Sequence, residues 1–370
     1  MASMEPEVSR GLWLLAWRRL RADKVAMASL AVVAAFLLLL GLSATGLVAS
    51  DWEAEVGVNY APPGFVGAEP AGRQLAQVAN AKTEAPPENP LDPLKDVIRE
   101  LRAEAGDAPQ AVLNDYGIAD PIGKELAEIH TELAKSKRAA VAARKSTLPF
   151  GADKWGHDIL KKTVKGSETS IVVGLVAALL ATLIGTLFGA FSGYFGGVVD
   201  DLFNWFYSIF TSVPNLLLIM AVAAVLQHKG VSTIVLILAL TGWTGTYRLI
   251  RAEYLKHKSR EYVLAAKAIG ASDLRRMFGH IFPNVSHVAL VQMSILSVDF
   301  IKFEVILSFL GFGVPVGVVS WGSMLNEAQN ELILGKWWQL TAASVAMAVL
   351  VTAFSLFTDA MRDALDPKLK

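Results

Sequence analysis

The stretch EYVLAAKAIGASDLRRMFGHIFPN, residues 261–284, lies between two long apolar segments of this 370-residue chain. Its pattern predicts two short helices joined at Gly270, with a basic surface. Helices this short are marginal in isolation and need another surface to pack against. A membrane-spanning segment does not need such a loop for its own stability, so the loop is a candidate binding surface for a partner.

Each part of this element carries its own helix signal. Ser259 is placed to cap the first helix, and Glu261 stands in the first turn, where a negative charge suits the helix dipole. Gly270 is placed to end that helix in the left-handed conformation, and Ser272 can cap a second helix over residues 273–281. Helical spacing predicts that one face of the first helix gathers Tyr262, Ala265, Ala266 and Ile269. Small alanines on this face would allow a partner to approach closely.

The apolar segments outside this loop are long enough to cross a bilayer, which takes about 20 residues per helix. Hydrophobic residues make up 53% of the chain, above the roughly 45–50% of soluble domains. The runs of apolar residues are 25–49, 171–199, 205–226, 231–247, 288–312 and 340–357. We therefore predict an all-α polytopic membrane protein with about six transmembrane helices in a lipid bilayer.

The charges orient this protein, although the formal net charge is zero. Residues 248–287 hold eight basic residues against three acidic ones, and the segment before the first apolar run adds Arg10, Arg18, Arg19, Arg21 and Lys24. Short basic loops stay in the cytoplasm. Both basic segments reach the same side by simple alternation of the spans, which predicts cytoplasmic N- and C-termini.

This placement divides the chain into four parts. Residues 1–24 form a cytoplasmic segment, 25–49 the first transmembrane helix, 50–148 an extracytoplasmic insertion, and 149–370 a five-helix core with the cytoplasmic loop 248–287. A cleaved signal peptide is the alternative for the first span, but the apolar run exceeds the roughly 7–15 residues of a signal core.

The insertion differs in composition from the rest of the chain. Residues 61–93 are rich in Pro, Ala and Glu, which is typical of an extended linker. Residues 93–105 and 122–143 then show apolar residues at helical spacing. These patterns predict a small helical cap over the outer mouth, or alternatively a module that contacts a receptor.

Three charged residues, Asp299, Lys302 and Glu304, interrupt the fifth apolar segment. A charge near the bilayer centre costs at least about 2.5–3.5 kcal/mol on insertion scales, so these side chains should face protein or water. Asp299 and Lys302 are spaced to pair on one helix face. Two interpretations remain open: a structural ion pair at a subunit interface, or a polar lining of a translocation path.

Several kinds of chemistry are not indicated. The chain has no cysteine, which excludes disulfides and thiolate sites. It has no G-x-x-x-x-G-K-[ST] motif, so it has no phosphate-binding P-loop. The six histidines show no metal-ligand spacing. We expect no catalytic residue, no metal site and no nucleic-acid binding in this chain.

The order Ala265-Ala266, Gly270 and Pro283 resembles the EAA loop of the membrane subunits of bacterial ABC importers. Leu264, His280 and Phe282 depart from that pattern. The form AAKAIGAS, with H-x-x-P-N at residues 280–284, resembles the C-type inner-membrane permease of the peptide/nickel branch. Other similar segments are PFGADKWGHDIL (149–160), GYFGGVVD (193–200), SVPNLLL (212–218), FLGFGVPVGVVSWGSML (309–325) and RDALDPK (362–368). The resemblance covers residues 17–48 and 149–370 and leaves the insertion without a counterpart.

This resemblance implies a type I ABC importer permease of the bacterial inner membrane, for peptides or a related small solute. It implies three kinds of partner protein: a second homologous permease, two cytoplasmic P-loop ATPases and an extracytoplasmic solute-binding protein. ATP and Mg would be bound by the partner subunits rather than by this chain. The residues implied to couple this chain to the ATPases are Glu261, Ala265, Ala266, Gly270, Ala271, Ser272, Asp273, Arg275 and Pro283.

Two other classes of function remain alternatives. A membrane enzyme would need polar groups that converge at one membrane face, and the sequence offers only the charges of the fifth segment. A membrane sensor or scaffold would use the outer insertion to bind a ligand. The sequence does not identify a substrate.

Overall fold

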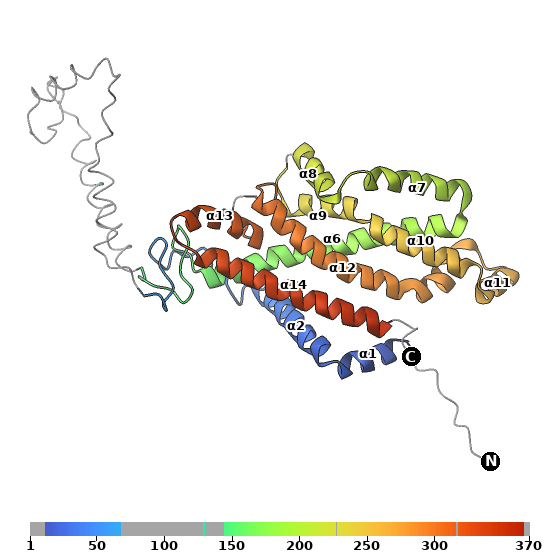
Figure 1. Ribbon diagram of the computed structural model, residues 1–370, viewed down its shortest axis with the longest axis horizontal. Helices are drawn as coiled ribbons and strands as arrows, with labels where there is room; N and C mark the ends of the chain where they lie inside the picture. Colours follow the sequence, from blue (N-terminus) through green and yellow to red (C-terminus); the bar gives the residue numbers. More distant parts are fainter. Residues whose placement is uncertain (1–11, 68–128, 130–143, 227, 316, 366–370) are drawn as a thin grey trace, which may run out of the picture.

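The computed structural model describes residues 12–67, 129, 144–226, 228–315 and 317–365, and these are mostly helical (Figure 1). The helices are α1 (Leu12–Ala22), α2 (Lys24–Ala44), α6 (Ile159–Phe195), α7 (Gly197–Thr211), α8 (Asn215–Leu226), α9 (Val231–Gly242), α10 (Thr244–Lys258), α11 (Glu261–Ala268), the π-helix η1 (Arg275–Ile281), α12 (Phe282–Phe309), α13 (Trp321–Ile333) and α14 (Trp338–Leu365). The all-α class predicted from the sequence is confirmed. The helices predicted in the insertion lie outside the described residues, apart from residue 129.

Three of these helices, α2, α6 and α14, are long and apolar enough to cross a membrane by themselves. Two broken pairs, α7 with α8 and α9 with α10, bring the number of spans among the described residues to as many as five. The fifth predicted span lies largely in α12, which is not among the spans counted here and carries Asp299, Lys302 and Glu304 in its second half. At 28 residues, α12 still measures about 42 Å, enough to cross a hydrocarbon core of about 30 Å.

The break between α7 and α8 has a local cause. The α7–α8 pair bends by 85° at the short connection that contains Pro214, because proline lacks the N–H that would continue a helix. The α9–α10 pair bends by only 41°, and α10 continues to Lys258. The start of the predicted cytoplasmic loop, residues 248–258, is therefore helix rather than loop.

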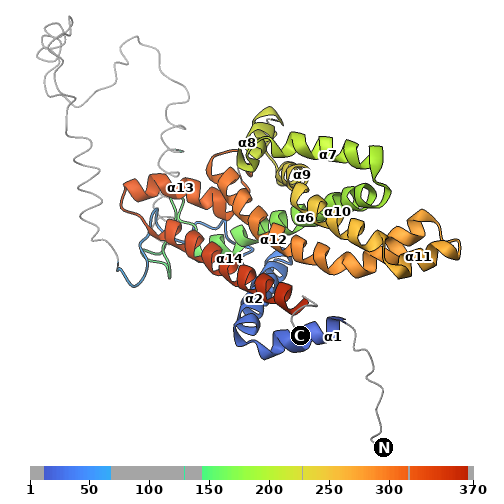
Figure 2. The same ribbon diagram turned by 45° about the vertical axis from the view of Figure 1, so that its right-hand side comes forward.

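Helix α6 runs through the middle of the bundle, with α2 and α14 on one side and α9 and α10 on the other (Figures 1 and 2). Gly185, Gly189 and Gly193 recur every four residues and so share one face of α6. A Cβ on Gly189 would lie 2.7 Å from the carbonyl oxygen of Tyr247 on α10. The two backbones therefore touch, which is how small residues pack helices closely in membranes.

The bundle has two distinct ends. Helices α11 and η1 form one end, and α13 lies at the other (Figures 1 and 2). Near α13, the segments on either side of the insertion meet through isolated bridges, such as those between Gly57 and Lys145 and between Pro63 and Leu148. The indole N–H of Trp338 donates to the carbonyl of Ala152 at 2.7 Å, and this hydrogen bond joins the bridged segments to α14.

Candidate functional site

The loop at residues 261–284 folds into α11 and η1, as its pattern predicts. Helix α11 begins after Arg260, not Ser259, and has no side-chain N-cap. The Ser259 hydroxyl instead donates to the carbonyl of Lys256 at 3.3 Å, so it completes the end of α10. Gly270 has a φ of +84°, the left-handed conformation expected for the residue that ends a helix here.

The second helix of the element is a π-helix, which begins at Arg275. The hydroxyl of Ser272 accepts a hydrogen bond from the N–H of Arg275 at 3.4 Å, in agreement with the predicted cap. π-Helical turns are rare and frequently occur at functional sites.

This element, which we call the α11–η1 element, is braced against α6 and α10. Tyr194 at the end of α6 donates its hydroxyl hydrogen to Asp273 at 2.7 Å. Arg276 pairs with the same carboxylate, and its guanidinium lies 5.7 Å from the centre of the Tyr194 ring. The hydroxyl of Tyr254 on α10 donates to the carbonyl of Met277 at 3.1 Å. These contacts join the element to α6 and α10, whose contact through Gly185, Gly189 and Gly193 we call the glycine-lined interface.

The opposite surface of the element exposes large apolar side chains. Leu264, Ile269 and Leu274 are 53%, 86% and 58% exposed. Basic Lys267 and Arg275 are also exposed beside them. An apolar surface with a basic rim, on an element that is firmly held from behind, is suited to bind another protein.

The predicted coupling residues fall on both sides of this element. Glu261, Ala265, Gly270, Ser272, Asp273, Arg275 and Pro283 are exposed, and Ala271 is half-buried. Ala266 differs, because it is buried at 4% exposure, like its neighbour Val263 at 2%. Its small size serves internal packing, so the prediction that it shares the exposed face with Ala265 is wrong.

The three charges of α12 do not form one site. Asp299 and Lys302 pair at 2.8 Å, as their spacing predicts, with side chains 42% and 45% exposed. Glu304 is fully buried on another side of the helix. It accepts hydrogen bonds from Ser170 on α6 at 2.6 Å and from Ser308 at 2.7 Å. Glu304 therefore braces α12 against α6, and only the Asp299–Lys302 pair is accessible.

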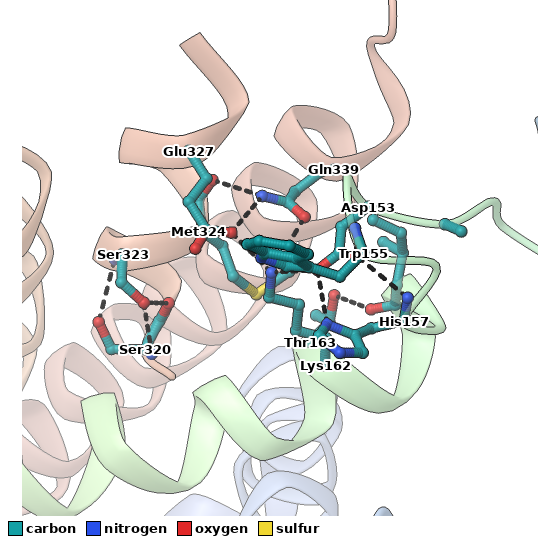
Figure 3. A network of polar contacts seen from close by, with 12 residues as sticks. Asp153, Trp155, His157, Lys162, Thr163, Ser320, Ser323, Met324, Glu327 and Gln339 are labelled. Atoms are coloured by element: carbon teal, nitrogen blue, oxygen red, sulfur yellow. Dashed lines mark hydrogen bonds and ion pairs between the residues drawn. The ribbon is translucent and has the colours of Figure 1, made fainter. Parts of the chain in front are cut away.

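A polar network that the sequence analysis did not identify lies near α13 (Figure 3). Lys162, in the first turn of α6, is buried, and its ammonium contacts Asp153 at 2.7 Å, Glu327 at 2.6 Å and Gln339 at 3.4 Å. Gln339 donates in turn to Glu327 at 3.1 Å. We call Asp153, Lys162, Glu327 and Gln339 the Lys162 cluster. It joins α6, α13, α14 and the segment before α6.

Asp153 is the most constrained carboxylate of this cluster. Its side chain accepts from the main-chain N–H groups of Trp155 at 2.8 Å and His157 at 3.0 Å. Burial by itself would raise the pKa of Asp153, but the charge and hydrogen bond of Lys162, helped by His157, hold that pKa below its usual value. Asp153 and His157 lie in the PFGADKWGHDIL stretch, but nothing in the sequence connects that stretch to residues 327 and 339. Among the described residues, no group of three or more His, Cys, Asp or Glu is placed to hold a metal ion.

A second ion pair ties α7 to the bundle at the other end of α6. Asp200 on α7 accepts two hydrogen bonds from Arg251 on α10, at 2.6 and 2.5 Å. The hydroxyl of Ser192 on α6 also contacts Asp200. This bidentate geometry is the strongest form of such a pair, and it fixes the start of the broken α7–α8 segment.

Comparison with known proteins places these features in a family. Residues 185–370 match the family described as "Binding-protein-dependent transport system inner membrane component". Residues 11–63 match the family described as "N-terminal TM domain of oligopeptide transport permease C".

Individual relatives agree with both matches. The chain is 36% identical to the dipeptide transport system permease protein DppC of Bacillus subtilis, over 60% of this chain and 69% of the relative. It is 38% identical to the oligopeptide transport system permease protein OppC of Bacillus subtilis, over 60% and 72%. It is 32% identical to the di/tripeptide transport system permease protein DppC of Pseudomonas aeruginosa, over 60% and 72%.

Proposed function

The chain belongs to the family of inner-membrane components of binding-protein-dependent transport systems, and on that premise we propose that it couples partner ATPases to peptide uptake through its α11–η1 element. It is an ABC importer permease, a multi-pass protein of the inner membrane. The peptide substrate is part of the proposal, supported by relatives that are named for dipeptide, oligopeptide and di/tripeptide transport.

The observation that carries the coupling proposal is the two-sided character of the α11–η1 element. One side is apolar and exposed through Leu264, Ile269 and Leu274. The other side is fastened to the ends of α6 and α10 through Tyr194 and Tyr254. A partner that binds the exposed side and moves would therefore displace α6 and α10 with it.

The proposed assembly contains three further kinds of protein. A second homologous permease completes the pathway, and two P-loop ATPases carry the ATP and Mg on the cytoplasmic side. A solute-binding protein delivers the substrate from the extracytoplasmic side. The N- and C-termini are cytoplasmic in this arrangement, because the basic segment before α2 and the basic α11–η1 element then lie on the same side.

The proposed mechanism is mechanical. ATP-driven closure of the ATPases pushes on the α11–η1 element, and the push reaches α6 through the Tyr194–Asp273 contact. Helix α6 packs directly on the backbone of α10, so the two move as one body and the glycine-lined interface transmits the displacement to the far end. Closure of the ATPases thereby opens the outer end of the translocation path while the binding protein releases its substrate.

Gly270→Asp tests this assignment. We expect the assembled complex to hydrolyse ATP while uptake per ATP falls about tenfold, a loss in the range typical of coupling between distant sites. Gly46→Asp is the matched control, because Gly46 also has a positive φ, +74°, with no atom within 4 Å of its added Cβ. Normal uptake by Gly270→Asp, or an equal loss in Gly46→Asp, would contradict the coupling role.

Affinity purification from the native membrane tests the assembly itself. In mild detergent, we expect mass spectrometry to find a second permease and P-loop ATPases with this chain, and the binding protein recovered with them would identify the substrate. Recovery of the chain without any ATPase would contradict the proposed assembly.

A further inference from the structure

A buried carboxyl group lies next to the Lys162 cluster, and no described residue gives it a hydrogen bond. Glu331 stands one helical turn after Glu327 on α13, and only 1% of its surface is exposed. Neither of its carboxyl oxygens makes a hydrogen bond to another described residue. A buried carboxylate with no partner is very costly, so this group needs either a proton or a nearby positive charge.

The ammonium group of Lys162, the positive charge of the cluster, makes its contacts to residues other than Glu331. An ammonium group has three hydrogens, and the three contacts of Lys162 are Asp153, Glu327 and Gln339. If Glu331 were ionised as well, Asp153, Glu327 and Glu331 would place three negative charges around one lysine. The cluster would then be two positive charges short, against one when Glu331 carries a proton.

The other groups around Glu331 do not supply that charge. The phenol of Tyr60, from the segment before the insertion, is also near Glu331 and is neutral, because burial and the negative charge of Asp153 raise the Tyr60 pKa above its usual value. The main-chain N–H of Lys154 acts on it only weakly and outside hydrogen-bond geometry. His157 contacts the carboxylate of Asp153 at 2.9 Å rather than Glu331.

We propose that Glu331 holds a proton while α13 is packed against α6, and that loss of this proton to water weakens the Lys162 cluster and releases α13. The ionised carboxylate would repel Asp153 and Glu327 and compete with them for Lys162. The cluster is thus a proton-controlled latch between α13 and α6. The latch belongs to this chain alone and does not rest on the proposed transport function.

The direction of the pH dependence follows from the environment of Glu331. Burial raises its pKa to about 7; the charge of Lys162 opposes this shift, and Asp153 and Glu327 add to it. When α13 is released into water, the pKa returns towards the ordinary value of 4.5. The packed state therefore binds more protons than the released state, so packing is most favoured at acid pH and weakens as pH rises through about 7.

The absence of cysteine from the natural chain allows a direct measurement with two spin labels. We would place cysteines at Leu160 in the first turn of α6 and at Ile333 at the end of α13, which are 45% and 84% exposed. The full-length chain in lipid nanodiscs would be examined by pulsed electron paramagnetic resonance from about pH 5.5 to about pH 8.5, a range that brackets the titration.

We expect one short label-to-label distance at the acid end and a second, longer distance whose share grows as pH rises towards and through the Glu331 pKa of about 7. Glu331→Gln, which mimics the protonated acid, should keep the short distance at every pH. Glu53→Gln removes an exposed carboxylate near the same end and should titrate like the parent. An unchanged distance in the parent across this range, or an unaltered titration in Glu331→Gln, would overturn the latch. The parent series decides the matter even if the glutamine variant fails to fold, and neither series needs ATP or a partner.

Discussion

Lys161 and Lys162 are adjacent in sequence but differ in their surroundings. Lys161 pairs with Asp51 at 2.6 Å, and both side chains are well exposed. Lys162 is buried and holds two carboxylates from different parts of the chain. Removal of one member of a buried ion pair leaves the other charge unpaired, whereas exposed pairs contribute little because water screens them.

We predict that Lys162→Met lowers the free energy of unfolding by about 3–5 kcal/mol. Lys161→Met should lower it by less than about 1 kcal/mol. Thermal unfolding of both variants in nanodiscs, followed by tryptophan fluorescence, measures the difference. Equal unfolding temperatures for the two variants would remove the structural role of the Lys162 cluster.

The Asp299–Lys302 pair poses a question of function rather than stability. Both side chains are partly exposed on α12, and charges at this depth should face protein or water, so in the proposed assembly we expect them to face the translocation path or the second permease. We predict that Lys302→Met abolishes uptake while the complex still assembles, because an unpaired Asp299 would remain in the path. Uptake by reconstituted complex and its subunit composition are the two measurements. Loss of assembly would instead place the pair at a subunit interface.

At this scale the sequence predicts local pairs and misses distant ones. The spacing of Asp299 and Lys302 on one helix is sufficient to predict their contact, and it is confirmed. The contact of Lys162 with Glu327 depends on how α13 returns to the start of α6, which no local pattern encodes. For the same reason Glu304 could not be separated from Asp299 and Lys302 before the direction of each side chain was known.

Among the elements, the interface of α6 and α10 depends on small residues. Gly189 on α6 faces Tyr247, whereas Gly245 on α10 has no atom within 4 Å of an added Cβ. A methyl group at Gly189 must therefore push the two backbones apart, and one at Gly245 meets open space.

We predict that Gly189→Ala destabilises the protein by about 1–3 kcal/mol, the usual effect of overpacking a close interface. Gly245→Ala should leave stability the same or raise it by up to about 1 kcal/mol, because alanine favours helix more than glycine does. Unfolding temperatures in nanodiscs provide the comparison. A stability for Gly189→Ala equal to that of the parent would show that the backbones are not in contact.

Helix boundaries were predictable where a residue imposes them. Pro214 predicts a kink, and the chain breaks there; Gly270 predicts the end of a helix, and α11 ends beside it. The end of α10 at Lys258 was not predictable from apolar content, because its last turns are polar and are stabilised by packing on α6. The same limit applies to the start of α6 at Ile159, well before the apolar run at 171.

For the molecule as a whole, composition and charge predict the all-α membrane class, because runs of about 20 apolar residues are typical of transmembrane helices. The apolar, exposed face of the α11–η1 element was not predicted in full. Its sequence shows alternating small, basic and apolar residues, and only the fold reveals that Ala266 turns inwards while Ile269 turns outwards. The prediction that a partner binds this loop stays a prediction.

The most direct test is a photo-crosslinking amino acid at Ile269, the most exposed apolar residue of the element at 86%. Ile333, at the other end of the bundle and 84% exposed, is the matched control. Irradiation of membranes that contain the intact complex should link position 269, and not position 333, to a P-loop ATPase. A crosslink to the ATPase from position 333, or none from position 269 in a complex that hydrolyses ATP, would contradict the assignment of the α11–η1 element as the coupling surface.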